Sequence, residues 1–237
     1  LEFRRVLFRS IVNPKGEIIA FGGRIIDQGE PKYLNSPETP LFEKGRELFG
    51  LPQARQALRE ANTAIVTEGY MDVIALSQNG VGNAVATLGT ATTPTHVQKL
   101  LRQVDRIVFS FDGDNAGRKA AWRALENALE ALADNKQIGF VFLPAEHDPD
   151  SFIRAFGKAE FDRLVAQAMP LSDFLLRELA QRNEADPNFW DSASLADLQL
   201  VRLLSQPAAP PKKRGDTSLP PAMAVLATYR NAIARGA

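Results

Sequence analysis

Acidic residues follow three short apolar runs of this sequence at the points where the runs end. The runs and their acidic residues are 64–66 with Glu68 and Asp72, 107–111 with Asp112 and Asp114, and 140–143 with Asp148 and Asp150. Continuous apolar runs of this length are typical of strands buried on both faces of a parallel sheet. Ligands of open α/β sheets bind at the carboxyl ends of the strands. The sequence therefore predicts that these carboxylates lie where the chemistry takes place.

Carboxylates that meet at one edge of a sheet repel one another unless a cation lies between them. Hard oxygen ligands suit Mg²⁺, which binds a few carboxylates together with substrate phosphates. This pattern predicts a magnesium-dependent enzyme that acts on phosphates. Simpler roles stay open for single positions: Asp72 as a charge near a helix N-terminus, Asp114 or Asn115 as an N-cap, and Asp148 or Asp150 as a cap before Ser151.

The central part of the chain alternates between strand and helix patterns. Strands are expected at 64–67, 83–87, 107–111 and 140–143, and helices at 70–78, 94–103 and 116–133. Such alternation predicts an α/β fold with a mostly parallel sheet, flanked by helices and connected by right-handed crossovers.

The flanking segments have other patterns. Two β-like stretches, 18–21 and 24–26, flank Gly22-Gly23, and a turn is expected at 13–16. Further expected elements are helices at 44–51 and 54–61, broken at Gly50 and Pro52, helices at 151–156 and 161–168, a helix from 171, a linker at 208–215 and a helix at 223–234.

These patterns suggest a division of the chain. Residues 1–10 fit no following pattern and are interpreted as a non-native scar outside the fold. The remaining parts are a mixed α/β piece at 11–61, the alternating domain at 62–145, a helical extension at 146–182 and a divergent tail with a Pro-rich linker at 183–237.

Composition narrows the function classes. The chain has 28 Lys and Arg against 28 Asp and Glu, so no overall basic charge points to nucleic acid, although a local basic groove stays possible. The absence of Cys excludes disulfides and Cys-ligated zinc and suits a reducing compartment. The two histidines, His96 and His147, are interpreted as surface or loop residues. No apolar run approaches the ~18 residues of a membrane span.

With these residues in hand, the chain resembles the RNA polymerase domain of the bacterial DNA primases of the DnaG type. Glu68 and the Asp112-Gly113-Asp114 turn match the Toprim signature of a glutamate and an Asp-x-Asp at two strand ends. Longer segments resemble primase motifs: FGGR at 21–24, PKYLNSPET at 31–39, KGRELFGL at 44–51, EGYMDV at 68–73, ATLGT at 86–90 and DGDNAGR at 112–118. The resemblance runs from about residue 11 to about residue 182.

The resemblance implies template-directed synthesis of short RNA primers on single-stranded DNA from ribonucleoside triphosphates, with two or more Mg²⁺ (or Mn²⁺) ions. It makes Glu68, Asp112 and Asp114 the principal metal ligands and, with Lys44, the catalytic residues. Asp72, Asp148 and Asp150 become auxiliary ligands. The residues expected to hold template, primer or triphosphate are Arg24, Lys32, Tyr33, Asn35, Lys44 and Arg46.

The resemblance also implies partners and a location. The expected partners are the DNA template, the RNA primer and a replicative helicase, the last through a C-terminal domain that is not recognisable here. Zinc is expected only in an N-terminal module that this chain lacks. The protein is expected to be a monomer in the bacterial cytoplasm, at the replication fork, without membrane contact.

Alternative functions stay open from the sequence. Another Toprim enzyme, a topoisomerase or a nuclease, shares the signature, but a topoisomerase needs a strand-cleaving tyrosine among Tyr33, Tyr70 and Tyr229. A phosphatase of the haloacid dehalogenase type would need Thr or Val soon after the second Asp, where the chain has Asn115. A truncated fragment could also bind nucleic acid or helicase without activity of its own.

Overall fold

The computed structural model describes residues 6–25, 33–132 and 135–185. The chain divides into two units, Leu1–Ala131 with Gln137–Ala168, and Leu132–Lys136 with Met169–Ala237. In the second unit, β8 (Met169–Pro170) precedes α6 (Leu171–Ala185). The candidate site is built entirely from the first unit. The linker expected at 208–215 and the helix expected at 223–234 lie outside the described residues.

An antiparallel sheet begins the first unit. Its strands, in spatial order, are β1 (Val6–Val12), β2 (Ile18–Ile25) and β3 (Tyr33–Asn35). The expected turn joins β1 to β2: the Gly16 N–H donates to the Asn13 carbonyl at 2.9 Å, and Gly16 has a φ of 86°. β2 runs without a break through the glycine pair at 22–23, where the sequence indicated two separate stretches.

Residues 6–10 have a place in this sheet. They form the first part of β1 and pair with β2, with Arg9 opposite Gly22 and Ser10 opposite Phe21. The expectation that residues 1–10 stand outside the fold is therefore wrong for the second half of that segment.

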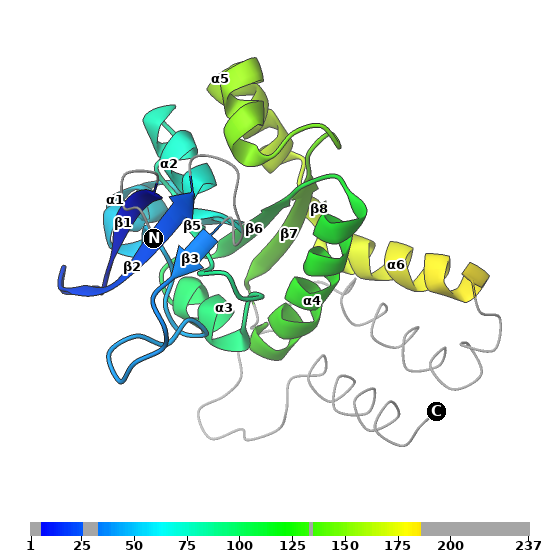
Figure 1. Cartoon of the computed structure of the whole chain (residues 1–237). Coiled ribbons are helices and arrows are strands. Elements are labelled where there is room, and N and C mark those ends of the chain that lie inside the picture. Colours follow the sequence, from blue (N-terminus) through cyan, green and yellow to red (C-terminus); the bar gives the residue numbers. More distant parts are fainter. Residues whose placement is uncertain (1–5, 26–32, 133–134, 186–237) are drawn as a thin grey trace. The chain divides into compact units, whose positions relative to one another are not determined.

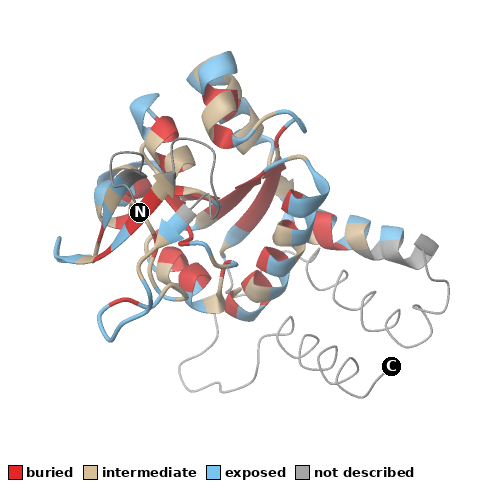
Figure 2. Ribbon diagram, viewed as in Figure 1, coloured by how far each residue is buried: buried red, intermediate tan, exposed pale blue. Residues whose placement is uncertain are grey.

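The second sheet of this unit is parallel. Its strands are β4 (Thr63–Thr67), β5 (Ala84–Ala86), β6 (Arg106–Phe111) and β7 (Gln137–Phe142). They lie in the order β5-β4-β6-β7, and every neighbouring pair is parallel. Figure 2 shows these strands as the buried centre of the fold. The α/β class and the parallel sheet expected from the alternating pattern are confirmed.

Helices cover both faces of the parallel sheet (Figure 1). They are α1 (Leu51–Ala61), α2 (Tyr70–Gln78), α3 (Pro94–Leu101), α4 (Asn115–Ala131) and α5 (Pro149–Ala166). On one face, Val108 and Val141 pack with Leu76 of α2 and Phe152 of α5. On the other face, the rings of Phe109, Phe111 and Phe140 stack with centroids 5.5–6.4 Å apart.

The segment expected as a helix at 44–51 is instead a series of turns, so this prediction is wrong. The turns are stabilised by bonds to distant residues, because the backbone N–H and C=O of Phe49 both pair with Ala86 of β5. Helix α1 begins only after Gly50, whose φ of 79° suits glycine. Pro52 lies in the first turn of α1, where a missing N–H costs nothing.

The two helices expected at 151–156 and 161–168 are the two halves of α5. Gly157, with φ 77° and ψ 174°, makes a kink between them. None of the helices in the described part of the chain has both the length and the apolar character needed to cross a membrane.

Candidate active site

The carboxylates at the ends of β4 and β6 lie at the same edge of the parallel sheet. β4 and β6 are neighbours in register, with Val66 opposite Phe109, so Glu68 and Asp112 leave the sheet side by side. A pocket of about 320 Å³ opens at this edge. Its lining includes four acidic residues from three segments of the chain: Glu68 and Asp72, Asp112, and Asp148. The structure thus brings together the three predicted strand ends.

The pKa values of Glu68 and Asp72 show the effect of the neighbouring carboxylates. Partial burial raises the pKa of Glu68, and the negative charges of Asp112 and Asp114 raise it further. Burial, followed by the charges of Asp148 and Asp112, raises the pKa of Asp72 to about 7. Hydrogen bonds from the backbone at Gly69 and Asp150 oppose this rise without cancelling it. The site is therefore an accumulation of negative charge that an added cation would stabilise.

The donor chemistry fits a hard divalent cation, because every acidic group that lines the pocket is a carboxylate. Within residues 6–25, 33–132 and 135–185, no three acidic or histidine side chains are already arranged closely enough to hold a metal ion. The carboxylates are thus suited to such a cation in type and charge, while their side chains do not form a closed set of ligands. The metal assignments stay predictions.

Several of these carboxylates also cap helices, as the simpler readings expected. The Gly117 N–H donates to Asp114 at 2.7 Å, the Ser151 N–H to Asp148 at 2.7 Å, and the Gly69 N–H to Asp72 at 3.2 Å. A carboxylate has two oxygens, so capping orients the group and leaves further acceptor capacity. These bonds hold Asp72 and Asp148 in place at the pocket. Asp114 is held at the start of α4 and is not among the described residues that line the pocket.

Asp150 behaves differently from the other predicted auxiliary ligands. It forms an ion pair with Arg154 one turn along α5. It is not among the described residues that line the acidic pocket.

The predicted nucleic-acid residues are spread over three segments. Asn35 lines the acidic pocket, and its amide donates to the Leu88 carbonyl at 2.9 Å, which ties β3 to the loop after β5. Arg24 lies on β2, opposite Tyr33 of β3. Lys32 and the side chain of Tyr33 lie outside the described residues. Lys44 and Arg46 lie in the turns before α1, and Arg46 forms an ion pair with Glu43 at 3.4 Å.

Helix α3 holds the turn that carries Lys44 and Arg46. The Lys44 carbonyl lies 3.0 Å from Nε2 of His96, the Gly45 carbonyl accepts from the Thr93 hydroxyl at 2.6 Å, and the Arg46 carbonyl accepts from the Lys99 ammonium at 2.5 Å. Three residues at three-residue spacing on one helix face therefore bind three successive carbonyls.

His96 is fully buried, so the expectation of a surface or loop residue is wrong. Its Nδ1 accepts from the Thr93 N–H at 3.2 Å, which leaves Nε2 to carry the proton and donate to Lys44. Burial lowers the pKa of His96 to about 4, so the ring is neutral at physiological pH. A single histidine near a helix start carries no sequence signal for such a role.

Replacing His96 tests this anchoring. His96→Leu leaves the Lys44 carbonyl and the Thr93 N–H without a partner, so we expect the free energy of unfolding to fall by about 2 kcal/mol. Urea denaturation at neutral pH measures it, with Thr95→Ala as the control, because Thr95 is exposed on the same helical turn. Equal stability of the two variants would contradict the anchoring role.

The raised pKa of Asp72 predicts a pH-dependent stability. Because the folded-state value of about 7 lies above the value of 3.8 for an unperturbed Asp, folding favours the protonated form. The stability that the protonated Asp72 contributes is fully present below about pH 4 and is lost as the pH rises through 7. Between pH 5 and pH 8, without divalent cations, the wild type should lose on the order of 2 kcal/mol relative to Asp72→Asn. Denaturant titrations of both proteins measure the difference, and identical pH profiles would refute the prediction.

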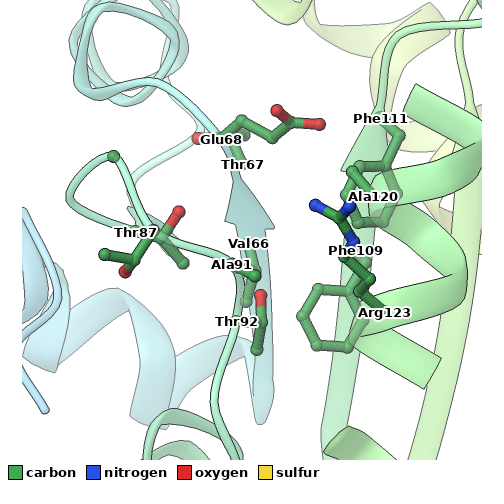
Figure 3. Close-up of a pocket in the computed structure, with 12 residues that line it drawn as sticks. Val66, Thr67, Glu68, Thr87, Ala91, Thr92, Phe109, Phe111, Ala120 and Arg123 are labelled. Carbon is green, nitrogen blue, oxygen red and sulfur yellow. The ribbon is translucent and has the colours of Figure 1, made fainter. Parts of the chain in front are cut away.

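A second pocket, of about 300 Å³, shares Glu68, Thr87 and Gly89 with the acidic pocket. Figure 3 shows the Arg123 side chain of α4 pointing into it from one side, with Glu68 and Thr87 on the other. No role was expected for Arg123, since an arginine on an amphipathic helix is usually solvated. Only its place on the helix that follows the Asp112-Gly113-Asp114 turn could have drawn attention to it.

Two protein families and several known primases match this chain. Residues 65–153 match the family described as Toprim-like, and residues 2–55 match the N-terminal domain of the DNA primase catalytic core. The fold is thus the Toprim fold, preceded by a part found in primases. The DNA primase of Neisseria meningitidis is 59% identical over 179 residues, which are 75% of this chain and 30% of that protein.

The solved structures that resemble this chain are also primases. The Escherichia coli primase catalytic core is 42% identical, with a TM-score of 0.77 over 98% of this chain and 71% of that one. A DnaG primase catalytic domain bound to single-stranded DNA is 41% identical, with a TM-score of 0.76 over 96% of this chain and 70% of that one. The chain belongs to the DnaG family of bacterial DNA primases. It spans about 30% of the length of the curated primases that it matches.

Proposed function

We propose that this chain carries the nucleotide-joining centre of a primase, which makes short RNA primers on a single-stranded DNA template. The observation that carries the proposal is the pocket at the ends of β4 and β6, which is lined by Glu68, Asp72, Asp112 and Asp148. The charge of Asp112 raises the pKa of both Glu68 and Asp72 there. Support comes from the related catalytic domain that is described as bound to single-stranded DNA.

The reaction is a nucleotidyl transfer. The 3′-hydroxyl oxygen of the primer forms a bond to the α-phosphorus of a ribonucleoside triphosphate, the bond to the bridging oxygen breaks, the hydroxyl proton is released, and pyrophosphate leaves. Bound Mg²⁺ or Mn²⁺ would neutralise phosphate charge and lower the pKa of the attacking hydroxyl. Glu68, Asp112 and Asp114 would hold it, with Asp72 and Asp148 as auxiliary groups.

The chain's own residues fix where this chemistry takes place. The capping bonds of Asp114 and Asp148 keep these carboxylates at the strand ends. Asn35 borders the same pocket, where its amide is within reach of a nucleotide. Arg24, Lys32, Tyr33, Lys44 and Arg46 are proposed to contact template, primer or triphosphate, since basic side chains position phosphates without reading sequence. The helicase and the cytoplasmic location stay predictions from the resemblance.

Lys44 allows a test of template contact. In Lys44→Ala we expect weaker binding of single-stranded DNA and a log–log salt dependence that is shallower by about one unit of slope, because one fewer counterion is released. Fluorescence anisotropy over a series of salt concentrations measures both. Lys158→Ala is the control, because Lys158 lies on α5 in an ion pair with Asp162. An unchanged slope would make Lys44 an ordinary solvated side chain.

The function as a whole is tested by incorporation of labelled ribonucleotides on a single-stranded template, with a supplied primer, with Mg²⁺ and without it. Metal-dependent extension is the expected result. DNA cleavage without extension would favour a nuclease, and DNA binding without either activity would favour an inactive binding fragment. A topoisomerase cannot use Tyr70 to cleave a strand, because Tyr70 is only 3% exposed.

A further inference from the structure

The pocket that contains Arg123 opens on the opposite side of β6 from the acidic pocket. Phe109 and Phe111 line the Arg123 pocket, whereas Ser110 and Asp112 line the acidic pocket. Successive side chains of a strand point to opposite faces of the sheet, so the two pockets lie on different faces near the end of β6. They meet at Glu68, Thr87 and Gly89, which line both. One extended ligand could therefore occupy both pockets at once.

The Arg123 pocket is rich in hydrogen-bond donors. The Arg123 guanidinium points into it (Figure 3), and within the described part of the chain this group makes no hydrogen bond or ion pair. Three threonines, Thr87, Thr90 and Thr92, also line the pocket. The Thr90 hydroxyl is buried and has no hydrogen-bond partner among the described residues. A buried hydroxyl without a partner in the same pocket as a guanidinium favours an anionic ligand with several oxygens.

Part of the lining of the Arg123 pocket is apolar. Phe109 and Phe111 are almost completely buried and form this part with Ala120 of α4. Arg123 itself is exposed, so its guanidinium can be reached by a ligand from solvent, while the rings cover the floor of the pocket beside it. Arginine also matches phosphate geometrically, because its fork of N–H groups can bind two phosphate oxygens at once. The chemistry fits an oxyanion, and the proposed function supplies one in the triphosphate of the nucleotide.

We propose that the Arg123 pocket holds the β- and γ-phosphates of the incoming ribonucleoside triphosphate, and then the pyrophosphate that leaves. Arg123 is the binding residue, and the hydroxyls of Thr87 and Thr90 complete the site. This inference rests on the proposed function, since it places the α-phosphate at the acidic pocket, next to Glu68. The border at Glu68 is where the α-phosphorus exchanges its bond to the bridging oxygen for one to the primer.

Inorganic pyrophosphate is the probe that tests this site without requiring catalysis. Isothermal titration of the whole chain with pyrophosphate, in excess Mg²⁺ and in its absence, compares wild type, Arg123→Gln and Lys119→Gln. Lys119 is the matched control, because it is an exposed cation on the same helix that does not line the pocket. Thermal unfolding confirms that each variant folds as the wild type does.

We expect Arg123→Gln to weaken pyrophosphate binding at least ~10-fold, the usual size of a charged hydrogen-bonded contact, and Lys119→Gln to leave it unchanged. Arg123→Lys should recover part of the loss. The proposal is overturned if the wild type does not bind pyrophosphate, if Arg123→Gln binds as the wild type does, or if Lys119→Gln weakens binding equally. Pyrophosphate binding that depends on Arg123 in a chain without polymerase activity would refute the proposed function and leave this site in place.

Discussion

Asp112→Ala should abolish ribonucleotide incorporation while the fold stays intact. Asp112 lies at the end of β6, lines the acidic pocket and raises the pKa of both Glu68 and Asp72. Removing a group that stabilises charge at a reacting phosphate typically costs a factor of ~10²–10³ in rate or more. Extension of a supplied primer measures the loss.

The same substitution should have the opposite effect on the stability of the metal-free chain. It removes a negative charge that repels Glu68 and Asp72, so the denaturation midpoint at pH 8 should rise. Glu126→Gln, on the outer surface of α4, is the control for both measurements. Incorporation by Asp112→Ala at the wild-type rate would remove Asp112 from the catalytic site. A lower midpoint would show that repulsion does not dominate there.

Gly113→Ala should damage both stability and activity. A Cβ at this position would lie 2.0 Å from the carbonyl oxygen of Leu143 and 3.1 Å from the backbone nitrogen of Ala145. Both are main-chain atoms in the segment that follows β7, so the clash is relieved only by moving that backbone away from the end of β6. We expect a loss of about 3 kcal/mol in the free energy of unfolding, together with displacement of Asp112 and Asp114.

Gly45→Ala is the control for this effect, because its Cβ would meet only a methyl group of Thr93 at an ordinary 3.6 Å. Urea denaturation of the two variants, followed by primer extension, separates a general effect of adding a methyl group from a steric conflict at the active edge. Wild-type stability of Gly113→Ala would show that the backbone after β7 can move away freely.

The parallel sheet was predictable because its strands are buried on both faces. β4 and β6 therefore appear in the sequence as apolar runs, and the acidic residues that follow them mark the edge where ligands bind. Glu68 and Asp112 could be predicted to lie near each other for the same reason. Their joint effect on pKa depends on burial and distance, which only the folded chain provides.

The turns at 44–50 could not be predicted from local pattern. Their side chains suit a helix, but Gly50 takes a positive φ and the backbone binds α3 and β5, both distant in sequence. Tertiary contacts override helix propensity at such places. The roles of His96 and Arg123 could not be predicted for a related reason. His96 is placed by its contact with the Lys44 carbonyl, and Arg123 by the pocket that it lines.

The way in which α3 holds the Lys44 turn has a consequence for evolution and engineering. His96, Thr93 and Lys99 bind the carbonyl oxygens of residues 44–46, and every amino acid has a carbonyl oxygen. Side chains along this turn can therefore be exchanged while the path of the backbone is kept. Such an arrangement allows the charge of this turn to be changed by substitutions at Lys44 or Arg46, at little cost in stability.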